Sequence, residues 1–190
     1  MNAITVNATL AESFWSGLAA SRLRQVLAVL VGTLALAISA RIQVPFWPVP
    51  MTMQTFVVLM IGAAFGARLA VATLFTYLFE GAIGLPVFAT GTGLAYMTGP
   101  TAGYLIGFLA AATLVGWFAD RGLGRSVATT LLAFVAGEVV IFSLGTGWLA
   151  AQFGVEKALS GGLLPFLPGE GVKLALACAL LPVLWRLSRR

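Results

Sequence analysis

The stretch that decides the fold is Thr101 to Ala119, TAGYLIGFLAAATLVGWFA, which contains no charged side chain. A membrane-spanning helix needs about 20 mainly apolar residues, because each residue rises about 1.5 Å through a hydrocarbon core of about 30 Å. We therefore predict that this stretch crosses a lipid bilayer as an α-helix. Small residues recur in it at Gly103, Gly107 and Ala111, a spacing that lets helices approach closely.

Five further apolar runs lie before and after this stretch. They cover residues 26–40, 51–65, 69–83, 127–142 and 172–187. Segments rich in proline, glycine and aromatic residues separate some of them and are predicted to be loops, at 44–50, 84–100 and 152–171. The pattern predicts an all-α membrane protein, a bundle of six transmembrane helices forming one domain over residues 22–190.

The overall composition excludes a soluble domain and several kinds of catalytic site. Of the 190 residues, 60% are hydrophobic and only 9% are charged, whereas a soluble domain carries about a quarter charged residues. The chain has no histidine and one cysteine, Cys178, which excludes histidine-ligated metals, histidine-based triads and an internal disulfide. Walker A and GxSxG motifs are also absent from the sequence. We therefore expect neither an enzyme nor a bound metal or cofactor.

The basic residues predict the orientation in the membrane. With six spans, both termini lie on one side. That side holds Arg22, Arg24, Arg68, Arg121, Arg125, Arg186, Arg189 and Arg190, and the other holds Arg41, Lys157 and Lys173. Because basic residues favour the cytoplasm, we expect both termini to be cytoplasmic and attribute the net charge of +5 to orientation, not to nucleic-acid binding. The three long loops then face outward and are predicted to form a pocket with the start of the last helix.

Residues 1–21 form a short N-terminal segment before the first apolar run. Leu10, Phe14, Trp15 and Leu18 fit a short amphipathic helix lying on the membrane surface. A frayed terminus fits the same residues, so both interpretations stay open.

Two acidic residues and one lysine are candidates for function. Glu170 and Lys173 share a helix face near the outer interface, because they are three residues apart. They fit a ligand-binding pair or a simple ion pair at the start of the last helix. Glu138 lies inside an apolar run, where an ionisable group is costly and points to function. It fits a proton relay, a pocket residue or half of a structural pair.

Polar and aromatic residues near the outer face complete the candidate set. Gln54, one turn into the second helix, fits a hydrogen bond to a ligand or to a neighbouring helix. The aromatic residues of the outer loops fit an interfacial belt or an apolar cover over a small ligand; they are Phe46, Trp47, Phe88 and Tyr96.

Four segments carry a resemblance to a known family. They are VPFWPVPMTMQT at 44–55, GLPVF at 84–88, GPTAGYLIGF at 99–108 and PFLPGEGVK at 165–173. In this order they closely resemble the BioY family, the biotin-binding S components of energy-coupling factor (ECF) transporters, from about residue 25 to the C-terminus. The resemblance implies six helices, a biotin pocket near the outer face and a prokaryotic cell membrane. It also implies a transmembrane coupling protein and two cytoplasmic ATPases as partners, which supply the energy.

The resemblance also implies roles for individual residues. Lys173 is expected to bind the valerate carboxylate of biotin. Glu170, where the family usually has aspartate, is expected to contact the ureido ring. Thr90, Gly91 or Thr92 occupies the position of a polar contact after GLPVF. The aromatic residues Phe46, Trp47, Phe88 and Tyr96 suit the apolar middle of biotin, and Gln54 remains a candidate ligand contact.

Two other functions remain open at this point. One is a stand-alone carrier for biotin or another small anionic vitamin, driven by a proton or sodium gradient through Glu138. The other is an S component for a different vitamin. In either case the lipid bilayer surrounds the chain. The resemblance further implies a small-residue face on the first helix for coupling to a partner, and its nearest match here is Ala35 and Ser39.

Overall fold

Five long apolar helices make up most of the part that the computed structural model describes, residues 8–188. They are α2 (Arg22–Arg41), α3 (Gln54–Ala82), α5 (Ala102–Asp120), α6 (Val127–Phe153) and α8 (Leu167–Leu187). Each is long and apolar enough to cross a membrane. The shorter elements are α1 (Leu10–Phe14), β1 (Gln43–Val44), β2 (Met51–Thr52), α4 (Gly93–Met97) and α7 (Val155–Gly162).

Helix α3 folds back on itself at Gly66. There the backbone leaves the helical region, with φ 74° and ψ 171°. The side-chain amide of Gln54 donates a hydrogen bond to the Tyr77 hydroxyl at 2.7 Å, across 23 residues of sequence. In an unbroken helix these residues would lie about 35 Å apart. Residues 54–65, the first arm, and 67–82, the second arm, therefore run antiparallel, and they correspond to two of the predicted apolar runs.

The reversal is held by the end of α5. The Asp120 carboxylate accepts a hydrogen bond from the Ala67 backbone N–H at 3.1 Å, which satisfies a free donor at the start of the second arm. The fit around Gly66 is close, since a Cβ there would lie 2.2 Å from Asp120 Oδ1. A Cβ on Gly116 would likewise lie 2.5 Å from the Ala67 nitrogen. Glycine at both positions lets α5 cross directly behind the turn.

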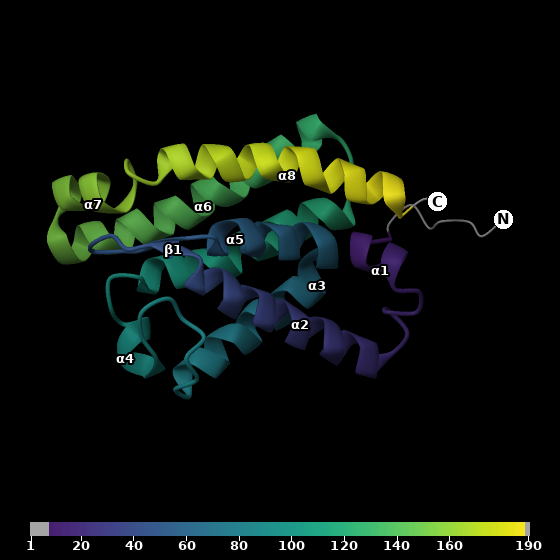
Figure 1. Ribbon diagram of the computed structural model, residues 1–190, viewed down its shortest axis with the longest axis horizontal. Helices are drawn as coiled ribbons and strands as arrows, with labels where there is room; N and C mark the ends of the chain where they lie inside the picture. The colour runs from purple at the N-terminus through teal and green to yellow at the C-terminus, as the bar shows by residue number, and fades with distance from the viewer. Residues whose placement is uncertain (1–7, 189–190) are drawn as a thin grey trace.

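The elements separate toward two ends of the bundle, as Figure 1 shows. Helix α1 and the end of α8 lie at one end, whereas β1, α4 and α7 lie at the other. Helix α5 packs against α3 and α6, α2 packs against α3, and α8 packs against α6. The predicted long loops therefore gather at one end and the short connections at the other. Of the basic residues used to predict orientation, Arg189 and Arg190 lie outside the described residues.

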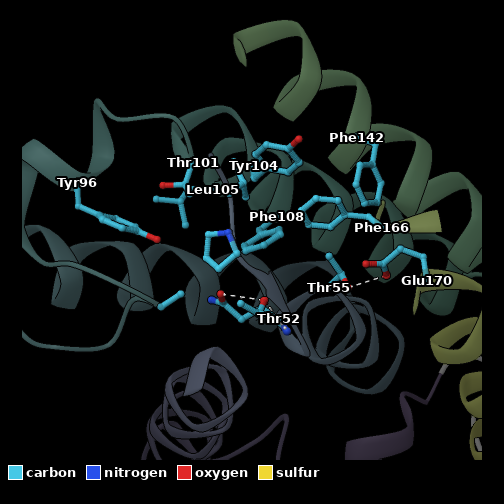
Figure 2. A pocket seen from close by; sticks show the side chains of 14 residues that line it. Thr52, Thr55, Tyr96, Thr101, Tyr104, Leu105, Phe108, Phe142, Phe166 and Glu170 are labelled. Carbon is cyan, nitrogen blue, oxygen red and sulfur yellow. Dashed lines mark hydrogen bonds between the residues drawn. The ribbon is translucent and has the colours of Figure 1, made fainter. Parts of the chain in front are cut away.

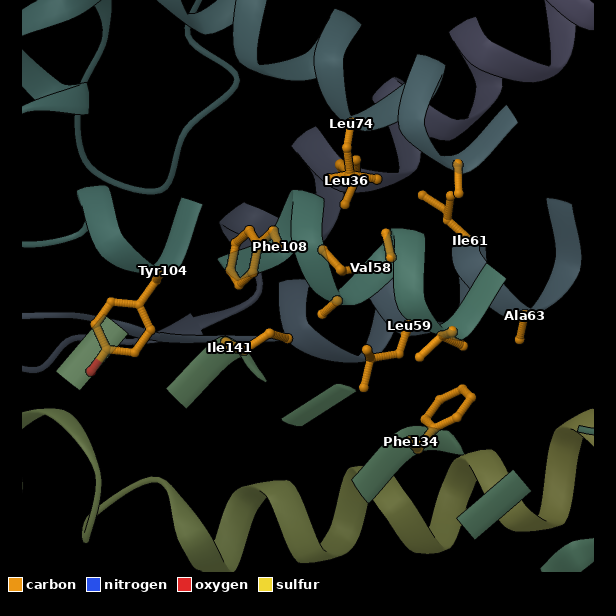
Figure 3. Packing of buried hydrophobic residues seen from close by; sticks show 14 of the residues in the cluster. Leu36, Val58, Leu59, Ile61, Ala63, Leu74, Tyr104, Phe108, Phe134 and Ile141 are labelled. Atoms are coloured by element: carbon orange, nitrogen blue, oxygen red, sulfur yellow. The ribbon is translucent and has the colours of Figure 1, made fainter. Parts of the chain in front are cut away.

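The core is apolar, and so is much of the exterior. Leu36 of α2, Val58 and Leu74 of α3, Phe108 of α5 and Ile141 of α6 are buried together (Figure 3). Many large apolar side chains point outward instead, among them Leu34, Phe75, Val139 and Val172. Exposed apolar surface on this scale is unfavourable in water and favourable in lipid.

The predicted loop at 152–171 is wrong, because most of it is helical. Helix α6 continues to Phe153, α7 covers residues 155–162 and α8 already begins at Leu167. Pro168 does not prevent this start, since it lies in the first turn of α8, where its missing N–H has no intrahelical partner to lose. The loop predicted at 84–100 likewise contains one short helix, α4. The proline-rich segment 44–50 connects β1 and β2, which pair antiparallel.

The described part of the N-terminal segment packs on the bundle through two leucines. Leu10 and Leu18 are buried, whereas Phe14 and Trp15 are exposed. Thr9 and Glu12 form a reciprocal capping box at the start of α1. Residues 1–7 lie outside the described part, and attachment of this segment to the membrane surface stays a prediction.

We predict that Gly66→Ala destabilises the fold more than Gly154→Ala. Both glycines have nearly the same backbone conformation, φ 74°, ψ 171° and φ 85°, ψ 158°, which costs other residues about 1–3 kcal/mol. Nothing lies within 4 Å of a Cβ on Gly154, whereas one on Gly66 overlaps Asp120. Thermal unfolding in detergent measures both variants. Equal losses would mean that the Asp120 contact does not matter.

Candidate functional site

A cavity lies among residues of β2, α3, α4, α5, α6 and α8 and the adjoining loops (Figure 2). Its empty volume is about 440 Å³, which includes space open to the surroundings. Most elements of the bundle contribute to the lining, from the β1–β2 loop at one end of the sequence to α8 at the other. The lining residues are Val49, Pro50, Thr52, Gln54, Thr55, Ala89, Tyr96, Thr101, Tyr104, Leu105, Phe108, Phe142, Phe166 and Glu170. Segments far apart in sequence thus form one chamber.

One end of the cavity is a buried charged network. The Lys173 ammonium donates hydrogen bonds to the Glu170 carboxylate at 2.8 Å, to Thr55 Oγ1 at 2.8 Å and to the Thr52 carbonyl at 2.6 Å. The Thr55 hydroxyl in turn donates to the other Glu170 oxygen at 2.8 Å. The side chains of Lys173 and Glu170 are only 11% and 6% exposed. All three donors of the ammonium are used, so the charge pair is closely held in this structure.

Lys173 does not line the main cavity itself. It lines an adjoining cavity, which shares Thr52, Phe166 and Glu170 with the main one. Glu170 therefore lines both spaces, and Lys173, which is paired with it, lines the adjoining one.

Aromatic rings form a second wall. Phe166 stacks on Tyr104, with ring centroids 6.4 Å apart and planes at 17°, and meets Phe142 edge-on at 5.8 Å. The Tyr104 hydroxyl donates to the Gly162 carbonyl at 2.6 Å, which ties α5 to the end of α7. In Figure 2 these rings face the cavity between Tyr96 and Glu170. A flat or apolar group would pack well against this wall.

The opposite end rests on Tyr77 and two stacked rings. The Tyr77 hydroxyl accepts from Gln54 and donates to the Val87 carbonyl at 2.9 Å. Phe88 meets the Tyr77 ring edge-on at 5.5 Å and stacks on Tyr96 at 4.9 Å. Tyr96 faces the cavity, whereas Phe88 lies buried behind it. The chain reversal at Gly66 therefore supports this end of the site directly.

The structure brings some of the sequence-predicted residues together and not others. Gln54, Tyr96 and Glu170 line the cavity, and Lys173 lines the adjoining one. Phe46 and Trp47 are 40% and 71% exposed and contact the rings of Phe166 and Phe153 edge-on, so they lie at the rim.

The segment after GLPVF contributes a different residue from those predicted. Thr90 and Thr92 are exposed, and Gly91 packs under the Tyr96 ring. The lining residue from this segment is Ala89. A ligand contact from residues 90–92 stays a prediction.

Sequence reasoning missed several lining residues. Thr55, Tyr104 and Phe166 were present in the segments that carry the family resemblance, yet nothing in their local pattern distinguished them from helix-packing residues. Their role comes from contacts across α3, α5 and α8, which no spacing along the chain reveals.

Glu138 lies on α6 beside the charged network. It is 8% exposed, and its carboxylate lies close enough to Glu170 and Lys173 to interact with both charges. Its Oε2 atom has no hydrogen-bond partner within residues 8–188. A buried polar atom without a partner is costly, so this one oxygen of Glu138 is unsatisfied beside the charged pair.

The chain matches known proteins over nearly all of its length. The model of the BioY family matches residues 9–190. The "Probable biotin transporter BioY" of Pyrococcus horikoshii is 38% identical over 142 residues, which cover 74% of this chain and 83% of that protein. The "Biotin transporter BioY" of Thermotoga maritima is 36% identical over 157 residues, which cover 82% of this chain and 92% of that protein.

A solved structure matches the fold. It is the crystal structure of the S-component for biotin from an ECF-type ABC transporter, with a TM-score of 0.75 and 24% sequence identity, over 89% of this chain and 93% of that one. The fold described above is thus that of an ECF S component. With the family model matching from residue 9 to the C-terminus, the chain belongs to the BioY family.

Proposed function

We propose that the chain captures biotin in the cavity described above, as the substrate-binding subunit of an ECF-type transporter in a prokaryotic cell membrane. The observation that carries this proposal is the buried Glu170–Lys173 pair at one end of an aromatic chamber. Relatives named as biotin transporters support the choice of ligand. Biotin combines a polar ureido ring, an apolar thioether ring and an anionic tail, so it needs both kinds of wall.

The ureido ring is the end of biotin that best suits the charged pair. Glu170 Oε1 and Lys173 Nζ lie 2.8 Å apart, so an extended ligand presents only one of its ends to both. A ureido group offers an N–H donor beside a C=O acceptor, which complements an acid beside an amine. A carboxylate at the same place would meet the Glu170 charge at close range, which is unfavourable. We therefore place the ureido ring here, in contrast to the expected contact between Lys173 and the carboxylate.

The remaining parts of biotin follow from this placement. The thioether ring packs against Phe166 and Tyr104, and the anionic tail extends toward Tyr96 and Gln54 at the other end. Phe46 and Trp47 then cover the rim, and the segment 90–92 closes over the tail.

We propose that the chain spans the membrane six times, with each arm of α3 making one crossing. The arms have about 12 and 16 residues, or about 18 and 24 Å of helix, so each crosses more than half of a hydrocarbon core of about 30 Å. The distribution of arginines supports cytoplasmic termini and an outward-facing cavity. A transmembrane coupling protein and two cytoplasmic ATPases then supply the energy, since the sequence has no Walker A motif.

We predict that Lys173→Ala weakens biotin and biotin amide by a similar factor of about 100, because both ligands keep the ureido ring and truncating one partner of a buried charge pair costs about 2–5 kcal/mol. Titration calorimetry of the purified protein in detergent measures both affinities. Lys157→Ala is the matched control, because Lys157 is exposed on α7 at the same end and its loss should change neither affinity.

If Lys173→Ala lost affinity for biotin but kept its affinity for biotin amide, the ureido placement would be overturned in favour of the lysine–carboxylate contact. Absence of binding of either ligand to folded wild-type protein would overturn biotin as the substrate.

One observation favours a second function, a stand-alone carrier coupled to an ion gradient. Glu138 is an acid buried in the membrane-spanning region beside the site, with an oxygen that lacks a partner within the described residues. Such a group fits a site for a transported proton or cation. The same group fits a purely local role in shaping the charged network.

We expect biotin uptake by the chain alone in proteoliposomes to be indifferent to an imposed proton or sodium gradient, because the proposed energy source is the partner ATPases. Radiolabelled biotin uptake with and without each gradient tests this, with Glu138→Gln as the variant. Gradient-driven uptake that Glu138→Gln abolishes would support the carrier and contradict the ATPase-driven proposal.

A further inference from the structure

A groove separate from the biotin cavity runs between α2 and the second arm of α3. The start of α2, where the groove begins, lies at the end of the bundle that carries α1 (Figure 1). The empty volume of the groove is about 820 Å³, larger than the 440 Å³ of the main cavity. Its lining includes Arg22, Val26 and Leu30 on α2 and Arg68, Leu69 and Ala72 on α3. They recur every three or four residues on each helix, so the groove follows the helix axes along two facing stripes.

The groove has a basic end and an apolar length. Arg22 and Arg68 are at the start of their helical stretches, and both are exposed. Farther along the groove from the two arginines, α2 contributes Val26 and Leu30, and α3 contributes Leu69 and Ala72. From Arg22 to Leu30 the helix rises about 12 Å, which spans much of one half of a bilayer core.

Neither arginine has a partner for its charge. Within residues 8–188, neither Arg22 nor Arg68 makes a side-chain hydrogen bond or an ion pair. The two acids near Arg68, Glu12 and Asp120, line the adjoining pocket and already accept backbone N–H groups, from Thr9 at 2.9 Å and from Ala67 at 3.1 Å. In the described residues neither guanidinium is therefore ion-paired, although the carboxylates of Glu12 and Asp120 lie in the pocket that Arg68 also lines.

We propose that this groove binds one anionic phospholipid. Guanidinium groups bind phosphate oxygens through paired, charge-assisted hydrogen bonds, and basic pockets between transmembrane helices bind anionic headgroups. The apolar length accommodates an acyl chain, because CH₂ groups need no hydrogen bonds and pack against the valine, leucine and alanine side chains. A zwitterionic lipid is bound more weakly, because its own ammonium group opposes the two arginines.

The experiment is native mass spectrometry of the full chain in detergent, with equal amounts of phosphatidylglycerol and phosphatidylcholine and no biotin. We expect one retained phosphatidylglycerol per chain, preferred about tenfold over phosphatidylcholine. Arg22→Gln with Arg68→Gln should reduce this preference to less than about twofold. Arg186→Gln is the matched control, because Arg186 is an exposed arginine at the same end of the bundle, on α8 and outside the groove; the preference should persist.

Two further measurements test the apolar length of the groove and the source of the phosphate. Ala72→Phe fills the groove and should lower retention of phosphatidylglycerol about fivefold, whereas Val71→Phe, on the exposed neighbouring position outside the lining, should not. Inorganic phosphate at the same concentration should not displace the lipid, because it lacks the acyl chain. Thermal unfolding of each variant verifies that it is folded.

Three results would overturn the proposal. They are equal retention of the two lipids by wild type, an equal loss of preference in Arg186→Gln, and displacement by inorganic phosphate. Groove variants that retain the lipid yet fail to co-purify with a coupling protein would assign the groove to a protein partner instead. Because lipid retention is measured without biotin, failure here is independent of the proposed transport function.

Discussion

The reversal of α3 at Gly66 is the constraint on which the cavity-bearing end of the molecule depends. A backbone conformation of φ 74°, ψ 171° is open to glycine and costly for other residues, and Asp120 supplies the hydrogen bond that the new helix start needs. Once the chain turns there, Gln54 and Tyr77 lie opposite each other, and Tyr77 holds Val87 and Phe88. The turn at one end of the bundle thus positions a wall of the cavity at the other.

The charged network illustrates how a membrane protein tolerates ions inside its fold. Burying a charge is expensive unless it is paired and hydrogen-bonded. Lys173 and Glu170 meet both conditions, through each other and through Thr52 and Thr55. A ligand that enters here must replace some of these contacts with equally good ones. That requirement favours a group with a donor and an acceptor side by side.

The sequence predicted the apolar framework well because hydrophobic runs and helix length are local properties. The runs at 101–119 and 172–187 correspond to α5 and to most of α8, and the break between 51–65 and 69–83 corresponds to the turn at Gly66. Prediction failed at 152–171, where prolines and glycines suggested a loop. Pro168 falls in the first turn of α8, and a proline there is compatible with helix, so composition alone misjudged the boundary.

By itself the sequence determined that the chain belongs in a lipid bilayer, how many apolar runs it has, and that Glu170 and Lys173 share a helix face. These follow from composition and from the fixed geometry of a helix. Only the tertiary structure decided that Thr55, Tyr104 and Phe166 line the cavity, that Phe88 supports it from behind, and that Glu138 lies beside the charged pair. Such contacts join residues from different helices, and the packing of helices depends on side-chain shapes across the whole bundle, which no single segment encodes.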